Sequence, residues 1–600
     1  MEKNNGWKPT IGIDLEDDAF CAIYSDKCQL ITAGPGAGKT ELLAQMIGYV
    51  FSSNRLGRKK VLAISFKKDS AKNLLDRVIK RNGNKFSDAI DSLTYDAFFK
   101  SLMDRFLDGV PEATRPTQDY ILDEVQFKES LQEVVNLVFD NSQIILNNIR
   151  AELDRTIYSD YGIDFKRIWK KLIDFKPSRL TFSMITNVTL LMLRKNPLVN
   201  RAVLATYEYI FLDEFQDTTS LQYEVIKQIF KGSEKKIVAV GDDKQKIMTW
   251  AGADSNIFGK FKLDFHSDER FLYLNHRSSD ILICLQRELY SILEVQKVID
   301  SSPINNDGEI KLINFQNNQQ ESTMIAKKIK TLIDAGVSPN EIVILSKQKP
   351  ETYAEFIMIE LANLNINARV ETVYQDLIKE NAVQLLLGML MLVYKGHDIG
   401  SWSIISDYFR RTKKESFSLN EMKILDSELI KIKGKFLTIH TKEQLNILLS
   451  ELLQIIDVNN LKGVFSEYSQ GTYLDTVLER FSDLFLLEIF KNQDKGFDIV
   501  IQSFLGEHSL PIMTIHKSKG LEFHSVFFIG LEDSAFWNFR NQPLEDKRAF
   551  FVAVSRAKKN LYFTYCSNRT NIKNPAQAKR QINEIYAVLL NSKYVQKITV

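Results

Sequence analysis

A glycine-rich segment near the start of the chain constrains its fold more than any other feature. Residues 31–40 read ITAGPGAGKT; they continue an apolar, strand-like run, Gln29–Thr32, and lead into a run with helical spacing. Lys39 adds a positive charge near the β and γ phosphates of a nucleotide, and Thr40 can bind a magnesium ion. Three glycines let the backbone curl so that successive N–H groups and the start of the helix face phosphate oxygens: Gly34, Gly36 and Gly38. The segment therefore predicts a P-loop fold that binds a nucleoside triphosphate; a plain glycine-rich turn is the alternative.

A second apolar run ends in two acidic residues. Tyr209–Leu212 reads YIFL and is followed directly by Asp213 and Glu214, the pattern of a buried parallel strand that delivers carboxylates at its tip. Asp213 is expected to hold the magnesium shell, and Glu214 to polarise the water that attacks the γ phosphate. A strand that ends in a solvated acidic loop is the alternative.

Short apolar runs recur along the chain and are separated by segments with helical spacing. The first series comprises residues 29–32, 61–64, 209–212 and 237–240. The second series comprises residues 271–274, 342–345, 512–515, 525–529 and 561–565. This alternation is typical of parallel sheets that are covered by helices and bind ligands at the carboxyl ends of their strands. The sequence therefore predicts an α/β fold with two lobes.

Two long stretches, about residues 102–197 and 391–507, have a different texture. They are rich in Leu, Ile, Lys and Glu at helical spacing and poor in Gly and Pro, which predicts mostly helical insertions. The first lobe is accordingly expected to comprise residues 1–101 and 198–268, and the second lobe residues 269–390 and 508–600.

The charge, cysteine content and hydropathy of the chain exclude several classes of protein. Among 600 residues, Lys and Arg total 78 and Asp and Glu total 76, so a histone-like polycation is excluded and binding to nucleic acid requires local basic patches. The 4 cysteines form no CxxC pair, which argues against a disulfide framework or a zinc cluster and favours a reducing, cytoplasmic location. The longest mainly apolar run, Ala382–Tyr394, is shorter than the roughly 20 residues that span a bilayer, so no membrane role is expected.

Further motifs follow the P-loop in a characteristic order. They are residues 213–218 (DEFQDT), 240–245 (VGDDKQ), 274–278 (LNHRS), 514–523 (TIHKSKGLEF) and 552–558 (VAVSRAK). Together with the P-loop they resemble the UvrD/Rep/PcrA family of superfamily 1 DNA helicases. The resemblance implies two RecA-like P-loop NTPase lobes that clamp one ATP with Mg2+ in the cleft between them. It also implies that each lobe carries a helical insertion that meets DNA.

The same resemblance implies roles for individual residues around the nucleotide. Gln245 is expected to sense the γ phosphate. Arg277 and Arg556 are expected to reach this phosphate from the second lobe, since an arginine supplied across a cleft stabilises charge in the transition state. Glu522 is expected to bind the ribose and His276 to stack on the base. An ordinary surface salt bridge is the alternative for Arg277.

For single-stranded DNA, the resemblance implies contacts from several motifs. Phe66 and Trp250 are the candidates for stacking on bases, which gives grip without sequence preference. The other candidates for contact with DNA are Thr94, Thr514 and His516. Core packing is the alternative for both aromatic residues, and an ordinary polar role is the alternative for His516.

Several positions depart from the usual motifs of this family. Ala19 stands where a glutamine that reads the adenine edge is usual, so weak discrimination between purine bases is expected. His276 replaces a tyrosine, and Met248 and Ala251 replace a tyrosine and an arginine of the third motif. The coupling to DNA is therefore expected to be altered.

The expected function is an ATP-dependent DNA translocase and helicase, by resemblance with 3′ to 5′ polarity, that acts on single-stranded DNA and on single/double-strand junctions. Basic stretches at residues 166–171 and 410–414 are candidates for contact with duplex phosphates, and a solvated surface is the alternative. Two other functions stay open. One is a DNA-stimulated ATPase subunit that serves a separate nuclease, as UvrD-like components of some bacterial anti-phage systems do. The other is a nucleotide-switched scaffold for which DNA is irrelevant.

Overall fold

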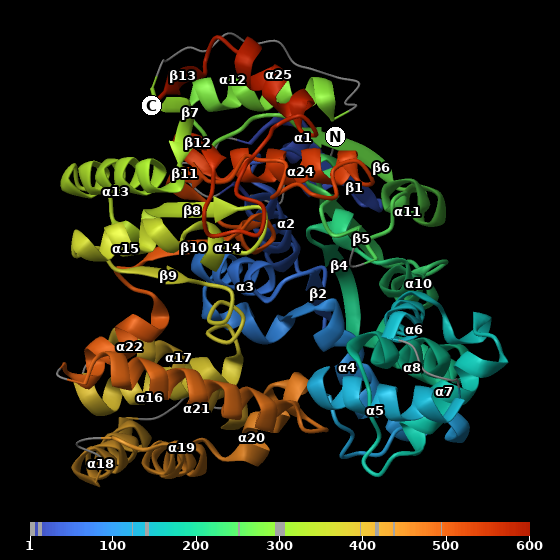
Figure 1. Ribbon diagram of the computed structural model, residues 1–600. Helices are drawn as coiled ribbons and strands as arrows, with labels where there is room; N and C mark the ends of the chain where they lie inside the picture. Colours follow the sequence, from blue (N-terminus) through green and yellow to red (C-terminus); the bar gives the residue numbers. More distant parts are fainter. Residues whose placement is uncertain are drawn as a thin grey trace.

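The computed structural model describes residues 7–9, 15–122, 124–138, 143–249, 252–293, 307–396, 398–413, 419–435, 439–493 and 495–600. Within these residues the chain forms two parallel β-sheets that are covered by helices, and two clusters of helices that extend from them (Figure 1). The prediction of an α/β fold with two lobes is therefore confirmed.

The first sheet has six strands in the order β3-β2-β4-β5-β1-β6, and its neighbouring strands pair in parallel. The strands are β1 (Gln29–Ala33), β2 (Lys60–Ser65), β3 (Ile90–Thr94), β4 (Tyr207–Leu212), β5 (Lys236–Gly241) and β6 (Asp268–Leu272). Their side chains alternate between two buried faces, because successive residues of a strand point to opposite sides. Ile31 and Phe211 pack with the helices α1 (Asp17–Tyr24), α2 (Lys39–Ser52) and α3 (Lys68–Asn82). Leu30 and Ile210 pack on the other face with α4 (Tyr95–Arg105), α10 (Ser220–Phe230) and α11 (Ile257–Phe265).

The first helical cluster lies between β3 and β4 in the chain. It comprises α5 (Glu124–Val138), α6 (Gln143–Arg155), α7 (Ile163–Asp174) and α8 (Phe182–Lys195), and α9 (Pro197–Thr206) leads back into β4. Helix α8 packs against α4 and α10. The core of this cluster, which contains the fully buried Trp169, is continuous with the core on one face of the first sheet. The cluster is therefore anchored firmly to the first lobe.

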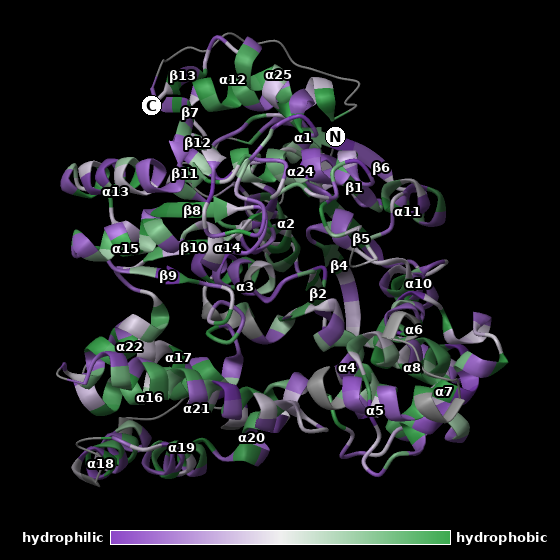
Figure 2. Ribbon diagram, in the orientation of Figure 1, coloured by the Kyte–Doolittle hydropathy of each residue, from purple (hydrophilic) through white to green (hydrophobic). Residues whose placement is uncertain are grey.

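The second sheet has seven strands in the order β13-β7-β12-β11-β8-β10-β9, again with parallel pairs. The strands are β7 (Glu309–Asn317), β8 (Ile342–Ser346), β9 (Ala368–Val370), β10 (Leu510–Thr514), β11 (Phe523–Phe528), β12 (Ala557–Asn568) and β13 (Gln596–Thr599). The helices of this lobe are α12 (Asp280–Leu289), α13 (Asn318–Asp334), α14 (Pro350–Tyr353), α15 (Glu355–Asn363), α23 (Ile515–Ser518), α24 (Pro543–Val554) and α25 (Asn583–Asn591). Figure 2 shows β8 mainly in the hydrophobic colour and α13 banded in both colours, as expected for a central strand and a covering helix.

One predicted strand belongs to the other sheet. The run at residues 271–274 was expected in the second lobe, but the strand here is β6, Asp268–Leu272, and it pairs with β1 at the edge of the first sheet. The first four residues of β6 are Asp, Glu, Arg and Phe, so hydropathy alone marks neither the start of the strand nor its partner. An edge strand tolerates such charged residues because one of its sides is not paired with another strand.

The second helical cluster comprises α16 (Asn381–Lys395), α17 (Ile399–Lys413), α18 (Leu419–Lys435), α19 (Lys442–Ile456), α20 (Val458–Val464), α21 (Tyr473–Lys491) and α22 (Phe497–Leu505). Its core extends from Tyr374 to Phe504. Residue 391, the expected boundary with the second lobe, therefore lies inside α16, whose apolar run is a helix buried within this cluster. None of the described helices has the length and apolar character needed to cross a membrane.

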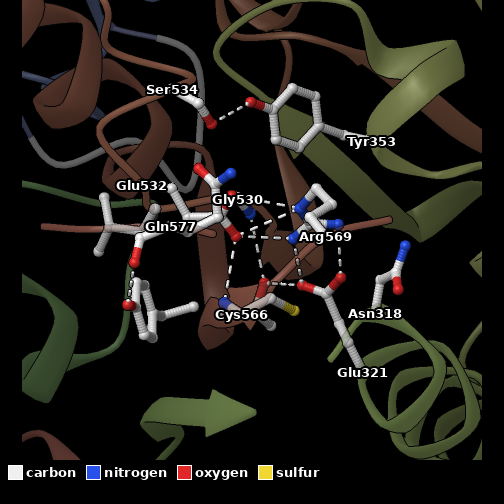
Figure 3. Close-up of polar contacts among 12 residues, drawn as sticks. Asn318, Glu321, Tyr353, Gly530, Glu532, Ser534, Cys566, Arg569 and Gln577 are labelled. Atoms are coloured by element: carbon white, nitrogen blue, oxygen red, sulfur yellow. Dashed lines mark hydrogen bonds and ion pairs between the residues drawn. The ribbon is translucent and has the colours of Figure 1, made fainter. Parts of the chain in front are cut away.

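A buried charge network fixes the ends of two strands in the second lobe (Figure 3). Arg569 follows β12, and its Nη1 and Nη2 atoms contact Glu321 of α13 at 2.9 Å and Glu532 at 2.8 Å. All three side chains are at most 1% exposed. The network therefore stabilises the loops at this end of the sheet only while all its members are present.

Candidate active site

The P-loop runs from β1 to α2 and contains the backbone conformations that its glycines predict. Gly36 and Gly38 have φ angles of +70° and +74°, which other residues rarely adopt. A Cβ atom added to Gly36 would lie 2.1 Å from the Oδ1 atom of Asn275. The backbone N–H of His276 donates to the Gly36 carbonyl at 3.0 Å. The loop is therefore held against the segment that leads into the second lobe.

Lys39 begins α2, and its ammonium group lies over the P-loop. The Nζ atom donates to the carbonyl oxygens of Ala33 and Gly34 at 3.3 and 3.4 Å. Thr40 follows in the first turn of α2, where free backbone N–H groups and the helix dipole favour anions. This end of α2 therefore combines a fixed positive charge with backbone donors, which suits a polyphosphate.

The acidic pair lies at the tip of β4, beside the P-loop. Asp213 is 2% exposed, and the Glu214 backbone N–H donates to its Oδ1 atom at 2.9 Å. Burial, with Glu214 next to it, raises the pKa of Asp213 to about 7. Burial also acts to raise the pKa of Glu214, but the charges of Lys39 and Lys519 outweigh it and hold that pKa at about 2. The two carboxyls therefore differ in proton affinity, and a bound divalent cation would favour ionisation of both.

Two arginines approach these carboxyls from the second lobe. Arg556 is 2% exposed, and its Nη2 atom donates to the Oε1 atom of Gln245 at 2.9 Å. Burial, together with Arg277, lowers the pKa of the Arg556 guanidinium to about 9. Arg277 donates through Nε to Glu522 at 2.8 Å and through Nη1 to the Ser555 carbonyl at 3.1 Å. Both arginines therefore lie where the two lobes meet.

One cleft between the lobes brings nearly all the predicted nucleotide residues together. Among the residues that line it are Gly36, Gly38, Lys39, Thr40, Asp213, Glu214, Gln245, His276, Arg277, Glu522 and Arg556. Gly34 is the one predicted nucleotide residue that does not line this cleft. Charged groups from both lobes thus converge on a P-loop, an arrangement suited to phosphoryl transfer by charge stabilisation.

At the start of α1, beside the cleft, the carboxylates of Glu16 and Asp18 already accept hydrogen bonds from backbone N–H groups. Ala19 is buried, while Glu16 accepts hydrogen bonds from the backbone N–H groups of Tyr273 and Leu274, both at 3.1 Å. Asp18 accepts one from Phe271 at 3.2 Å. These acidic side chains accept from backbone N–H groups of β6 and of the segment that follows it. The methyl side chain of Ala19 itself has no polar atom that could read a base.

Comparison with known proteins identifies the family. The family model of the UvrD/REP helicase N-terminal domain matches residues 16–161 and 126–266. The family model of the UvrD-like helicase C-terminal domain matches residues 271–485 and 450–568. The chain belongs to the UvrD-like helicases.

Relatives of this UvrD-like helicase match it over most of their length. A probable DNA helicase II homolog of Mycoplasma genitalium is 23% identical over 591 residues, which cover 89% of this chain and 82% of the relative. The ATP-dependent DNA helicase PcrA of Staphylococcus aureus is 24% identical over 615 residues, or 90% of this chain and 81% of the relative. A probable DNA helicase II homolog of Mycoplasma capricolum is 24% identical over 629 residues, or 92% and 84%.

The residues predicted to contact DNA do not share one surface in this helicase. Phe66 is half-buried and packs against the core of the second lobe. The backbone carbonyl of His516 accepts from Lys67 Nζ at 2.8 Å, which places His516 at the same interface between lobes. Burial, with the charge of Lys347 nearby, lowers the pKa of His516 to about 4, so its ring is neutral at pH 7.

The two threonines have structural roles as well. Thr94 Oγ1 accepts from the Ala97 N–H at 3.2 Å and caps α4, and Thr514 Oγ1 accepts from the Lys517 N–H at 3.4 Å and caps α23. Thr94 lines a separate groove between the first lobe and the second helical cluster. Trp250, like Ala251, lies outside the described residues.

The sequence alone assigns no function to several side chains in or near the cleft. Lys519 forms a buried ion pair with Asp217 and donates to the Gln245 carbonyl at 2.7 Å, which links the lobes behind the acidic pair. Glu41, next to Thr40, is held by Arg81 Nε at 2.7 Å and by Arg77 Nη1 at 3.2 Å. Lys519 stands inside a recognised motif and could have been singled out, whereas the partners of Glu41 on α3 follow from the packing of α2 on α3.

The basic stretches of the helical clusters are partly neutralised. Lys170 pairs with Asp174 at 2.8 Å, and Arg167 approaches Asp164 at 3.6 Å, both on the surface of α7. In the other stretch Arg410 lies 3.5 Å from Asp88, and Lys414 is outside the described residues. These contacts favour the solvated-surface interpretation of the first stretch.

Proposed function

We propose that this chain is an ATP-dependent DNA translocase and helicase that moves 3′ to 5′ on single-stranded DNA. The observation that carries the proposal is the contact between Gln245 of the first lobe and Arg556 of the second, directly beside the acidic pair. A nucleotide in this cleft would touch both lobes, so its hydrolysis would change how they fit together. The names of the relatives, which include an ATP-dependent DNA helicase, support the same activity.

Each residue of the cleft is assigned a separate role in ATP hydrolysis. Lys39 neutralises charge on the β and γ phosphates, and Glu214, kept ionised by the lysines around it, orients and polarises the attacking water. Arg556 and Arg277 stabilise the charge that develops on the transferred phosphoryl group. Arg277 leaves its contact with Glu522 as it does so, and Glu522, which keeps its pair with Lys558, then binds the ribose.

The acidic pair and Thr40 fit a magnesium ion. Two adjacent carboxyl groups in a largely buried site, one with a pKa near 7, are relieved of mutual repulsion by a divalent cation. Asp213 and Thr40 would hold the ion, which would supply charge neutralisation at the phosphates. A magnesium-dependent rise in nucleotide affinity, lost in Asp213→Asn, tests this assignment.

The path of the DNA is proposed to pass the interface between the lobes where Phe66 and His516 lie, and Trp250, which is outside the described residues, stays a candidate for stacking on a base. The expected partners are single-stranded DNA and its junctions with duplex. A subunit that serves a separate nuclease would share the ATPase site but would separate strands poorly by itself.

Strand displacement from tailed duplexes tests the proposed function. The purified chain with ATP is expected to release the strand from a duplex with a 3′ single-stranded tail and not from one with a 5′ tail. Lys39→Ala is the matched control for contaminating helicase. Release from the 5′-tailed duplex alone would reverse the polarity, and release from neither, with DNA-stimulated hydrolysis intact, would favour a subunit that depends on a partner.

A further inference from the structure

Helix α24 of the second lobe lies against the segment that follows β5 in the first lobe, residues 243–245. The helix has 12 residues, so it extends about 18 Å at 1.5 Å per residue. Arg556 follows its C-terminal end by two residues. Its core-facing side is fully buried; the residues on that side include Phe550 and Ala553. The helix is therefore a stiff element that moves with the second lobe.

The contacts between α24 and the first lobe run along the whole helix. At its C-terminal end Arg556 donates to Gln245 at 2.9 Å. In the middle the Nη2 atom of Arg548 contacts Oδ2 of Asp243 at 3.2 Å. At the N-terminal end Thr249 donates its hydroxyl to Glu545.

The side chains that make these contacts share one face of the helix. Glu545, Arg548 and Val552 are three and four residues apart, the spacing that stacks side chains along a helix. The Val552 carbonyl accepts from Arg556 Nε at 3.0 Å, so the arginine continues the same row. Asp546 points elsewhere: its carboxylate pairs with Lys347 of the second lobe at 2.6 Å and is almost completely buried. One face thus holds α24 in its own lobe, and the other meets residues 243–249.

The Arg548 contact is incomplete. Its Nε atom is buried and lacks a hydrogen-bond partner among the residues that the structure describes. Asp243 divides its carboxylate between Arg548 and Lys246, whose Nζ lies 2.7 Å from Oδ1. A bidentate pair with Arg548 would use both carboxylate oxygens and is the stronger geometry for arginine. The pair can therefore tighten when the lobes shift.

We infer that Arg548 and Glu545 are positioning residues that carry the state of the nucleotide cleft along residues 243–249 to the binding of DNA. Because α24 is stiff, a shift of Arg556 against Gln245 also shifts Arg548 against Asp243 and Glu545 against Thr249. Thr249 directly precedes Trp250, the stacking candidate. The inference rests on the proposed function, since it concerns how hydrolysis and DNA binding are linked.

The test compares Arg548→Ala with Arg540→Ala, a matched control at an exposed arginine just before α24. Basal ATP hydrolysis is expected to be close to wild type in both variants. Stimulation by single-stranded DNA is expected to fall about 2- to 30-fold in Arg548→Ala alone, the range for residues that modulate coupling between sites. Asp243→Asn should have the same effect, and the double variant should add little to either single one.

A second readout needs no turnover. The affinity for fluorescent single-stranded DNA is measured with and without a non-hydrolysable ATP analogue, and the difference between the two states should shrink in Arg548→Ala. Arg548→Lys keeps the charge and should recover part of this difference in DNA affinity. It replaces Arg548→Ala in the test if the alanine variant folds poorly. Full DNA stimulation in Arg548→Ala and Asp243→Asn would overturn the inference. A wild-type chain that ignores DNA would overturn the proposed function as well, and the two failures are thereby distinguished.

Discussion

Replacing Arg569 by leucine is expected to destabilise the second lobe strongly. The substitution removes the guanidinium that contacts Glu321 and Glu532 at 2.9 and 2.8 Å and leaves both carboxyls buried without a counter-charge. Breaking a buried ion pair by removing one partner costs about 3–5 kcal/mol. For a unit of about 200 residues, each kcal/mol lowers the melting temperature by about 2–4 °C. A loss of about 6–20 °C is therefore expected.

The pH dependence of this loss gives a second signature. Burial already raises the pKa of Glu532 in the native chain, and loss of Arg569 would raise it further. A carboxyl whose folded pKa is raised stabilises the fold below that pKa and loses this contribution as the pH rises through it. The deficit of Arg569→Leu should therefore be large near pH 8 and smaller near pH 5, where Glu532 recovers its proton.

Thermal unfolding of wild type, Arg569→Leu and Arg580→Leu at both pH values tests this reasoning. Arg580 is an exposed arginine of the same lobe and serves as the control. A triple variant, Glu321→Gln with Glu532→Gln and Arg569→Met, should recover much of the stability because it leaves no buried charge. An Arg569→Leu variant that melts like Arg580→Leu, with no dependence on pH, would refute the role assigned to the network.

Other substitutions test the cleft itself. Lys39→Ala should lower the rate constant of ATP hydrolysis by at least about 10²-fold, the typical cost of one electrostatic donor, and near-normal turnover would remove the assigned site. Glu214→Gln should keep nucleotide affinity, measured by equilibrium binding, and lose turnover, measured by single-turnover kinetics. A loss of affinity would contradict the role of Glu214 in polarising the attacking water. Arg277→Ala and Arg556→Ala should each slow hydrolysis by about 10³-fold or more with less effect on ATP affinity. If ATP affinity falls while the rate at saturating ATP is unchanged, these arginines do not stabilise the transition state. Because Ala19 offers no group that reads a base, the specificity constants for ATP and GTP in competition should lie within about 10-fold of each other; turnover confined to ATP would mean that another residue reads the base.

Much of the cleft could be predicted from sequence because its residues end strands or begin helices within short motifs. Lys39 and Asp213 are examples, since parallel strands bring their carboxyl ends to one edge of a sheet. Contacts such as Arg548 with Asp243 could not be predicted, because they depend on how two separately folded lobes fit together. Arg569 and Glu321 are 248 residues apart in the chain and meet only through the order of strands in the second sheet.

The strand at residues 268–272 shows a different limit. Its side chains are largely polar, and its place beside β1 depends on backbone pairing rather than on hydropathy. Similarly, the apolar run of α16 is compatible with either neighbour until its packing with the second helical cluster is known. Periodicity therefore identifies elements more reliably than it assigns them to a sheet or cluster.

The cleft between the lobes is proposed to hydrolyse ATP in response to DNA. The most direct measurement is the rate of ATP hydrolysis by the purified chain as single-stranded DNA is titrated, with Lys39→Ala measured in parallel. We expect a low basal rate that rises and saturates with DNA, and no such rise in Lys39→Ala. A rate that stays the same with and without DNA would contradict this proposal and would favour a nucleotide-switched scaffold.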